Sequence, residues 1–600
     1  MSQPLRRTAR SPEDLREEIL AFVCALGHPE LIDEDGSRFS LASLTPESAT
    51  AGAVQVRLEV EFGKLLLEIW GVGRSLVRRV ESVERKGLRL VLQARKRGAW
   101  GPAAGLEILD AADVELRAPA TGEPLIARRA GDRDEFERLL VTMLLREYPG
   151  LRLERVAHRS DRRHAFSGCY TRGWARRGRE AWAFLGLSEF ESPAAVENAL
   201  VYGLIWLDWL REHAGGSQEV VVSGLKLLLP PVAVGVAAHR AAYLSPHAAG
   251  IEILEWAPSD EHPRAIDLRD YGNVETRLTP RWRGARLLDE CRPLLRELLG
   301  PHARRVRVAP DTTGEALSLR ILGLDVARIE GGVRPEVFFG VEGERAPLEE
   351  AGGTATFHSF LEDVLRTRHP KSRHRTHPYY RLQPERWLES LLIDDLRRVD
   401  PALMAQHVYP QVPAFSGSPP CGAGFQPAPG SASRMPAPQQ FSRGVIDILG
   451  ATRDPESGAQ RLAVIELKLD EEPNLPLQGL DYWLRVKWLE DRDQFRQHGY
   501  FSGLSPSPAP PVIYLVCPAF RFHSTTERVL RYFQPSIRVV KVGVNQRWRE
   551  GVHVLFRRTL EGGRVIGERK FETPCDDGMS ARDLRVHVHA GTPKARRSLD

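Results

Sequence analysis

Residues 444–469 read GVIDILGATRDPESGAQRLAVIELKL, and the fold predicted for the C-terminal third of the chain rests on them. It holds two short apolar runs, joined at residues 454–458 by a connection that supplies Asp, Pro and Gly. These residue types suit a hairpin, so the pattern predicts two neighbouring antiparallel strands. Alternate side chains of a strand share a face, which puts Glu466 and Lys468 on one side. The hairpin therefore predicts that Glu466 lies beside Asp447, the acid of the first strand.

Charged residues inside these apolar strands have a functional and an ordinary interpretation. An acid and a base at the end of an apolar strand are costly to bury unless they pair, hydrogen-bond or bind a metal ion. In the ordinary interpretation, Asp447 ends a strand, and Glu466 with Lys468 forms an ion pair at a surface edge. The elements on either side of the hairpin favour the functional interpretation.

These flanking segments predict an α/β unit around the hairpin. Residues 384–399, PERWLESLLIDDLRRV, open with proline and carry a leucine-rich stripe at helical spacing, with Glu389 beside it. The helix LPLQGLDYWLRVKWLE follows the hairpin and places Gln478 and Tyr482 one turn apart. The strand PVIYLVCPAF, the helix TTERVLRYF and the strand SIRVVKVGV complete the predicted order.

This order of elements and acids resembles the PD-(D/E)xK nuclease superfamily, whose core runs helix, strands, helix, strand. The resemblance covers residues 384–544 and implies a restriction-endonuclease-like αβ domain. The catalytic positions that it implies are Glu389, Asp447, Glu466, Lys468 and Gln478. The proline that the family places before its first strand acid is absent, because Ile446 stands there.

The resemblance also implies a reaction. Asp447 and Glu466, with Glu389 as a further ligand, would hold Mg²⁺ or Mn²⁺, since these ions prefer oxygen ligands. The metal would activate a water molecule, Lys468 would orient it, and a phosphodiester bond of DNA would be hydrolysed. Gln478 would position the ligand shell. The likeness is nearest to archaeal-type mismatch endonucleases and to related repair, restriction or defence enzymes. The alternative function is a catalytically inactive scaffold or nucleic-acid-binding protein with the same fold.

A basic segment precedes the first helix of this unit and is the main candidate for nucleic-acid binding. Residues 366–381 combine Arg and Lys, which neutralise phosphates, with aromatic rings, which stack on bases. The expected contacts are Lys371, Arg373, Arg375, Tyr379, Tyr380 and Arg381. A solvated linker is the ordinary interpretation of the same run.

The whole chain is long enough for several domains, and its patterns predict an α/β multidomain protein. We expect a β-rich N-terminal domain over 1–125, an α/β domain without a recognised site over 126–300, a small β segment with a linker helix over 301–370, a nuclease-like domain over 371–560 with a disordered insertion at 416–440, and an extension with a mobile tail over 561–600. The apolar run at 220–238 is interpreted as two buried strands. The middle domain repeats the order of elements of the nuclease-like domain, which indicates either a degenerate copy or chance similarity.

Composition sets only broad limits on function. Hydrophobic residues make up 42% of the chain and charged residues 27%, which is typical of soluble globular proteins. Lys and Arg outnumber Asp and Glu by only 84 to 79, so net charge says little about a polyanionic partner. The six cysteines have no metal-ligand spacing. The N-terminus lacks the apolar stretch of a secretory signal. We therefore expect a cytoplasmic protein without membrane contact, either monomeric or homodimeric.

Overall fold

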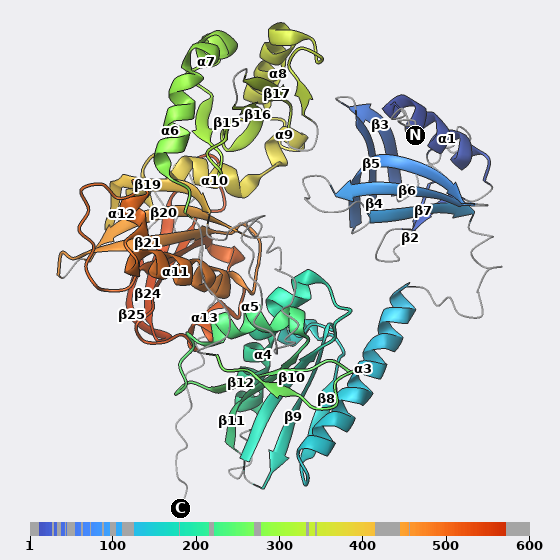
Figure 1. Ribbon diagram of the computed structural model, residues 1–600, viewed down its shortest axis with the longest axis vertical. Helices are drawn as coiled ribbons and strands as arrows, with labels where there is room; N and C mark the ends of the chain where they lie inside the picture. The colour runs from blue at the N-terminus through green and yellow to red at the C-terminus, as the bar shows by residue number, and fades with distance from the viewer. Residues whose placement is uncertain are drawn as a thin grey trace, which may run out of the picture.

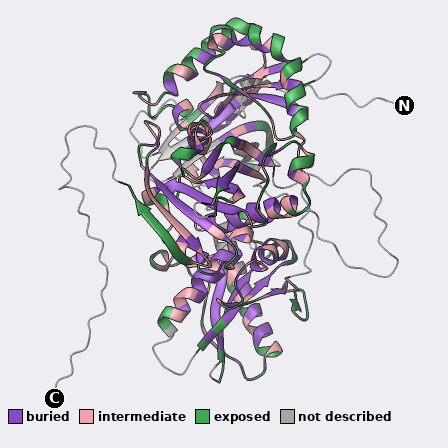
Figure 2. Cartoon of the chain, turned by 90° about the vertical axis from the view of Figure 1, so that its left-hand side faces the viewer, coloured by how far each residue is buried: buried purple, intermediate pink, exposed green. Residues whose placement is uncertain are grey.

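A computed structural model gives the fold of residues 11–571, apart from 111–124, 215–220, 269–277, 414–443 and shorter breaks that lie mostly before residue 104. Within this part the chain is a mixed α/β protein with several separate sheets (Figure 1). Figure 2 shows that buried residues gather in the sheets, while exposed residues line the outer sides of the helices. The expected insertion at 416–440 and the tail expected at the end of the chain fall outside the described residues. None of the described helices is long and apolar enough to cross a membrane.

The N-terminal unit is an antiparallel sheet covered by one helix. Helix α1 (Pro12–Cys24) begins at a capping box in which Ser11 and Asp14 bond to each other's backbone. The sheet has the order β2-β1-β7-β6-β5-β4-β3. Its strands are β1 (Pro29–Ile32), β2 (Arg38–Ser40), β3 (Val54–Glu61), β4 (Lys64–Gly71), β5 (Arg74–Lys86), β6 (Arg89–Lys96) and β7 (Ala104–Asp110).

The middle unit is an α/β domain with a six-stranded sheet of order β13-β12-β11-β10-β9-β8. Its elements are α3 (Leu125–Glu147), β8 (Arg152–Ala157), β9 (Tyr170–Arg177), β10 (Glu180–Leu187), α4 (Pro193–Ala214), β11 (Val221–Leu229), α5 (Pro231–Ala241), β12 (Gly250–Glu255) and β13 (Arg264–Ala265). The prediction of two strands at 220–238 is wrong, because the second half of this run is helix α5. Proline at the first helical position favours a helix start there.

A smaller unit follows and packs beside the C-terminal unit. Its five strands form an antiparallel sheet, covered by helices before and after it. The elements are α6 (Arg281–Glu290), α7 (Arg292–Leu299), β14 (Arg307–Pro310), β15 (Ala316–Ile321), β16 (Leu324–Glu330), β17 (Glu336–Phe339), β18 (Ala346–Pro347) and α8 (Gly353–Thr367). The turn between β15 and β16 contains Gly323, which has φ +78° and lies against the Arg386 carbonyl. A side chain has no room at this contact.

The C-terminal unit has a seven-stranded sheet of order β19-β20-β21-β22-β23-β24-β25. Its elements are α9 (Pro378–Arg381), α10 (Pro384–Leu392), β19 (Leu403–Pro413), β20 (Val445–Arg453), β21 (Gln460–Leu467), α11 (Leu475–Asp491), α12 (Gln494–Gln497), β22 (Val512–Pro518), α13 (Thr526–Leu530), β23 (Arg538–Val544), β24 (Val554–Glu561) and β25 (Arg564–Lys570). Strand β25 belongs to this sheet, so the expected domain end at residue 560 falls too early.

The first helix of this unit is shorter than the predicted helix over 384–399. Helix α10 ends at Leu392, and a short 3₁₀ turn covers Leu396–Arg398. The Asp395 side chain accepts a hydrogen bond from the Arg397 backbone NH, which begins a new turn in place of the helix. The hairpin of β20 and β21 is antiparallel, as its connecting residues predict.

Candidate functional site

Asp447 and Glu466 lie side by side in the middle of the C-terminal sheet. Ile448 pairs with Ile465 across β20 and β21, so the next residues outward, Asp447 and Glu466, face each other on one side of the hairpin. The Leu467 backbone NH donates to Asp447 Oδ2 at 2.9 Å. This bond fixes one carboxylate oxygen of Asp447.

Lys468 stands at the end of β21 between two carboxylates. Its Nζ lies 3.4 Å from Glu466 Oε1 and 3.5 Å from Glu385 Oε2. Glu385 was not among the predicted site residues, although it precedes Glu389 by four residues on α10. Residues four apart share a helix face, so this spacing is the signal that would have identified Glu385. Three acids, Glu466, Glu385 and Asp447, thus interact with this lysine.

Glu389 is buried, with 3% of its surface exposed, and it bonds to a residue that the sequence did not indicate. Gln411 Nε2 donates to Glu389 Oε2. Gln411 lies on β19 between two residues that pair with β20, and it therefore stands opposite Asp447. Its φ of +56° is unusual for a residue other than glycine. Strained backbone of this kind gathers at functional sites.

Burial makes these acids hard to ionise. The Glu466 side chain is 2% exposed, and burial, followed by the nearby Asp447 carboxylate, raises the pKa of Glu466 well above its ordinary value. Burial also raises the pKa of Asp447 and Glu385, and Lys468 opposes the shift in both. Burial raises the pKa of Glu389 to about 7. The site has more buried carboxylate than its cationic groups can compensate.

Two buried amides near the start of α11 lack hydrogen-bond partners among the described residues. Neither side-chain polar atom of Gln478 or of Asn474 has a partner, and Gln478 is 3% exposed. Tyr482 packs in the same cluster as Val464, and Gln478 lies one turn earlier on α11. Since α11 runs back along β21, this turn lies toward the Glu466 end of the strand. Unpaired buried amides are rare in folded proteins, so these two side chains could take part in binding a ligand.

The donor set fits a hard divalent cation. Its carboxylate oxygens are ligand atoms that Mg²⁺ and Mn²⁺ prefer, and Glu466 Oε2 is buried without a partner among the described residues. Asp447 and Glu466 are the residues that would hold the ion, and Glu389 is next to them. In the described part of the chain, no three acidic, histidine or cysteine side chains are already arranged around one ion position. The Leu467 amide and Gln411 occupy oxygens of Asp447 and Glu389 instead.

The basic segment at 366–381 is partly structural, which corrects the expectation for Tyr380. Arg368 is 1% exposed and lies 4.6 Å over the Trp387 ring. It donates to four backbone carbonyls, those of Leu322, Tyr379, Leu382 and Gln383. Tyr380 is buried against Trp387, with ring centroids 5.1 Å apart. Tyr380 is therefore a core residue and has no free face for a base.

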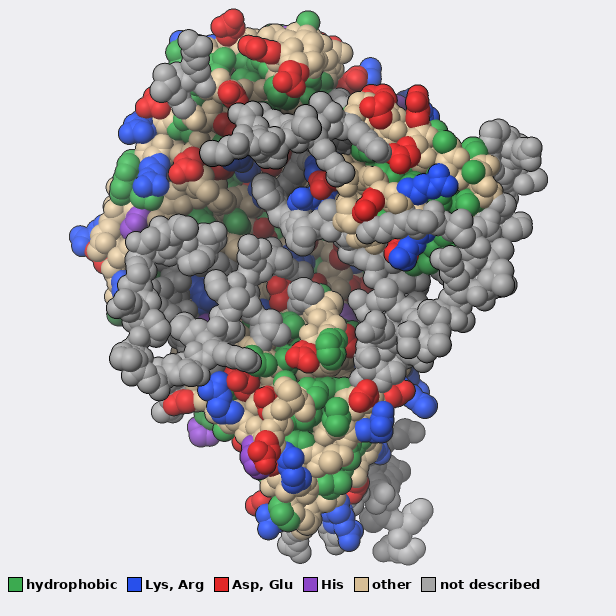
Figure 3. All heavy atoms as spheres, turned by 45° about the vertical axis from the view of Figure 1, so that its right-hand side comes forward, with side chains coloured by type: hydrophobic (Ala, Val, Ile, Leu, Met, Phe, Trp, Pro, Cys, Tyr) green, Lys and Arg blue, Asp and Glu red, His purple; other side chains and the backbone are tan. Residues whose placement is uncertain are grey.

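The other members of this segment lie at the surface. Lys371, Arg373, Arg375 and Arg381 are exposed, and Arg375 Nη2 lies 2.9 Å from Glu550. Tyr379 is partly buried and packs edge-on against Phe360. Figure 3 shows basic and acidic side chains mixed over the described surface of the face in view. The exposed basic residues of this segment are those available for a phosphate backbone.

Taken together, these charged side chains form a site that could bind a metal ion. Asp447, Glu466 and Lys468 converge at the end of a hydrogen-bonded hairpin, with two further acids from α10 beside them. Such a set can hold a cation, orient a water molecule and offset negative charge. Comparison of the chain with models of protein families, with curated proteins and with solved structures gives no match.

Proposed function

We propose that this protein is a metal-dependent nuclease of the PD-(D/E)xK type that hydrolyses phosphodiester bonds of DNA. One observation carries the proposal: Asp447 and Glu466 face each other on adjacent strands with Lys468 beside them. The order and direction of the elements from α10 to β23 support it, because they match the core that the resemblance implies. A restriction-endonuclease-like fold for residues 371–571 is part of this proposal.

Each residue has a role that follows from its position. When bound, Mg²⁺ would polarise the scissile phosphate and lower the pKa of a coordinated water. Asp447 and Glu466 offer the carboxylate oxygens for the ion. Lys468 is 3.4 Å from Glu466, and in this proposal its ammonium group would orient the attacking water and offset charge on the phosphate. Gln478 supplies an unpaired amide toward the same end of the strand.

The Glu389 carboxyl can change its protonation state near neutral pH. Its pKa of about 7 results mainly from burial, and a bound cation would favour the ionised form. We propose that Glu389 loses its proton when the metal binds and then acts as a further ligand, directly or through water. Metal binding at this site therefore releases protons.

A plasmid-cleavage assay with Mg²⁺, with Mn²⁺ and with EDTA tests the proposal. We expect metal-dependent cleavage, and we expect Asp447→Ala and Lys468→Ala each to lower its rate by about 100-fold or more. Glu490→Gln is the matched control, because Glu490 is a partly buried acid of the same unit whose pKa burial raises to about 7. It lies at the other end of α11. The control should cleave at the wild-type rate.

The alternative function has a different outcome in the same experiment. A folded protein that binds DNA but leaves the plasmid intact with both metals would be a nucleic-acid-binding scaffold, and the nuclease proposal would then be wrong. Equal loss of activity in Glu490→Gln would show that the variants act through folding. Circular dichroism and a calorimetric titration with Mn²⁺ separate loss of folding from loss of metal binding.

A further inference from the structure

The middle and C-terminal units share one strand order, which suggests how they are related. In the middle unit β8, β9 and β10 are antiparallel, β10, β11 and β12 are parallel, and β13 is antiparallel to β12. The sheet from β19 to β24 repeats these directions strand by strand. Helices α4 and α11 occupy the same place in the two units, as do α5 and α13.

The two units meet at equivalent positions. Leu244 stands three residues after the end of α5, Phe533 stands three residues after the end of α13, and these two residues form an antiparallel bridge. The flanking hydrogen bonds are reciprocal: Ser245 N donates to Tyr532 O at 2.7 Å, and Gln534 N donates to Tyr243 O at 3.2 Å. Equivalent segments that pair antiparallel with each other are related by a local two-fold axis.

The helices around this bridge follow the same symmetry. Helix α4 packs on α13, and α11 packs on α5. An ion pair accompanies each contact: Arg528 Nε lies 3.6 Å from Asp208 on α4, and Arg240 Nη2 lies 2.6 Å from Asp481 on α11. The first pair has its basic residue in the C-terminal unit and the second has it in the middle unit. This exchange is what a two-fold interface requires.

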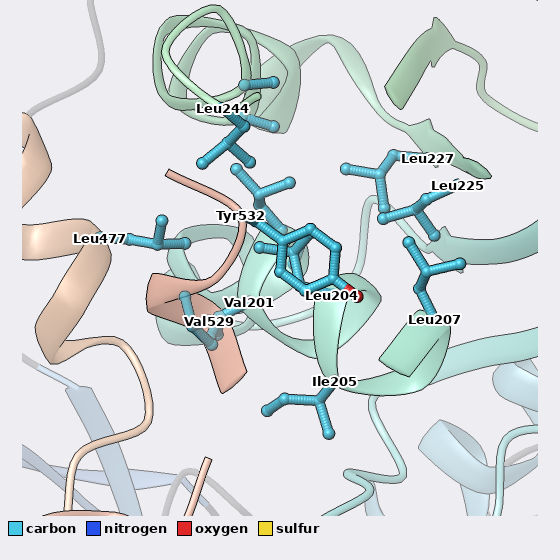
Figure 4. Packing of buried hydrophobic residues seen from close by; sticks show 14 of the residues in the cluster. Val201, Leu204, Ile205, Leu207, Leu225, Leu227, Leu244, Leu477, Val529 and Tyr532 are labelled. Carbon is cyan, nitrogen blue, oxygen red and sulfur yellow. The ribbon is translucent and has the colours of Figure 1, made fainter. Parts of the chain in front are cut away.

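The interface is a continuous apolar core. Figure 4 shows Leu204 and Leu207 of α4 and Leu225 and Leu227 of β11 in one cluster with residues of the other unit. Those other residues are Leu477, Val529 and Tyr532. A shared hydrophobic core of this kind is typical of obligate interfaces and not of transient contacts. The two units therefore form one rigid pair.

Each position of the candidate site in the C-terminal unit can be matched to an equivalent position in the middle unit. A Cβ at Gly203 of α4 would meet Leu225 and Leu227, and a Cβ at Gly479 of α11 would meet Ile513 and Leu515. Leu227 therefore corresponds to Leu515. Leu185 pairs with Leu227 as Glu466 pairs with Leu515, and Arg172 pairs with Leu185. The middle unit has Leu185, Leu187 and Arg172 where the C-terminal unit has Glu466, Lys468 and Asp447.

In the middle unit, the place that corresponds to the candidate site is filled by side chains of that unit. The Arg172 guanidinium lies 4.6 Å over the Phe166 ring and 5.8 Å over the Trp206 ring. It also donates to the Arg159 carbonyl at 2.6 Å. No acid occupies the positions that correspond to Asp447 and Glu466. The middle unit therefore lacks the carboxylates that a cation needs.

We propose that residues 125–265 are an inactive second copy of the C-terminal fold that occupies the place of a partner subunit. One chain then forms a closed two-fold pair with a single active site and cuts one strand of a DNA duplex. The part that concerns cutting rests on the proposed nuclease function. The part that concerns the internal pair does not. The full chain should remain a monomer of 67.3 kDa, because its two-fold face is already covered.

A designed cross-link tests the internal pair without any assay of activity. Leu244 and Phe533 lack hydrogen bonds to each other and are flanked by reciprocal bonds, an arrangement with Cα atoms about 4.5 Å apart that a disulfide can span. In the full-length Leu244→Cys/Phe533→Cys variant, oxidation should give a disulfide within one chain at the monomer mass. The single variants control for the native cysteines. A cross-link between two chains, or none in the folded double variant, would overturn the proposal.

Plasmid products test the single active site. With supercoiled plasmid and Mg²⁺ or Mn²⁺, open circles should accumulate first, and linear DNA should follow only through independent second nicks. Linear DNA formed in one binding event, with protein that dimerises in light scattering, would contradict the single-site proposal. If the plasmid stays intact with every metal while the disulfide forms within one chain, the nuclease function fails and the internal pair is supported.

Discussion

Replacing Glu389 by glutamine should stabilise the protein at alkaline pH, and this gain should disappear in acid. Glu389 is almost fully buried, and its pKa rises from the ordinary 4.5 to about 7 mainly because burial penalises the charged form. At about 1.4 kcal/mol for each pKa unit, this rise corresponds to roughly 3 kcal/mol. Glutamine keeps an oxygen that can accept the bond from Gln411 and carries no charge.

The direction of the effect follows from proton binding. The folded carboxyl holds its proton up to about pH 7, whereas the unfolded carboxyl loses it near pH 4.5. Between these values the folded state binds more protons, so the stability that Glu389 contributes is complete below pH 4.5 and is lost as pH rises through 7. The free energy of unfolding of Glu389→Gln, relative to wild type, should therefore increase by roughly 3 kcal/mol over this window.

Urea unfolding followed by tryptophan fluorescence, from below pH 4.5 to above pH 7, measures this difference. Only the difference in the free energy of unfolding between variant and wild type is compared, because a chain of several units does not unfold in one step. Glu362→Gln removes an exposed glutamate of α8 and controls for the substitution itself. Parallel pH curves for Glu389→Gln and wild type would refute the argument that burial keeps Glu389 protonated.

Three further predictions concern the surroundings of the site. Arg368→Met should lower the free energy of unfolding by about 3–5 kcal/mol, because four backbone carbonyls lose their hydrogen-bond donor. A loss below about 1 kcal/mol, measured by urea unfolding, would contradict this role. Gly323→Ala should destabilise by at least about 1–3 kcal/mol, since the new Cβ meets the Arg386 carbonyl and the backbone φ is +78°; an unchanged melting temperature would show that the turn adapts. Lys371→Ala and Arg373→Ala should each weaken DNA binding at any sequence. Each should also reduce the slope of the logarithm of the binding constant against the logarithm of salt concentration, by about the amount that corresponds to one phosphate contact. Fluorescence anisotropy at several salt concentrations measures this slope, and an unchanged slope would place the DNA elsewhere.

The local elements could be read from the sequence because their causes are local. Alternation of apolar and polar residues acts over a few positions, and turn residues act within one connection. This is why the hairpin of β20 and β21, and with it the neighbourhood of Asp447 and Glu466, follows from residues 444–469. The run at 220–238 is apolar at nearly every position, and such a run has no period that separates a strand from a buried helix. Its second half is therefore helix α5, contrary to the prediction.

The site was only partly predictable for a related reason. Glu385 and Gln411 join it through contacts between α10, β19 and β21, which are distant in sequence. The burial of Arg368 and Tyr380 also depends on their packing around Trp387. A charged or aromatic residue in a basic run looks the same in sequence whether it faces solvent or the core.

Residues 444–469 alone were enough to predict the β20–β21 hairpin and the acids and lysine that it carries, because a hairpin depends on side-chain periodicity and turn chemistry. The packing of α4 and α5 on α13 and α11 about a two-fold bridge could be seen only in the folded chain, as could the apolar and basic residues that the middle unit has where the C-terminal unit has acids. The physical reason is that hydrophobic burial is not directional. An apolar helix face must be covered, and its sequence does not state by which partner.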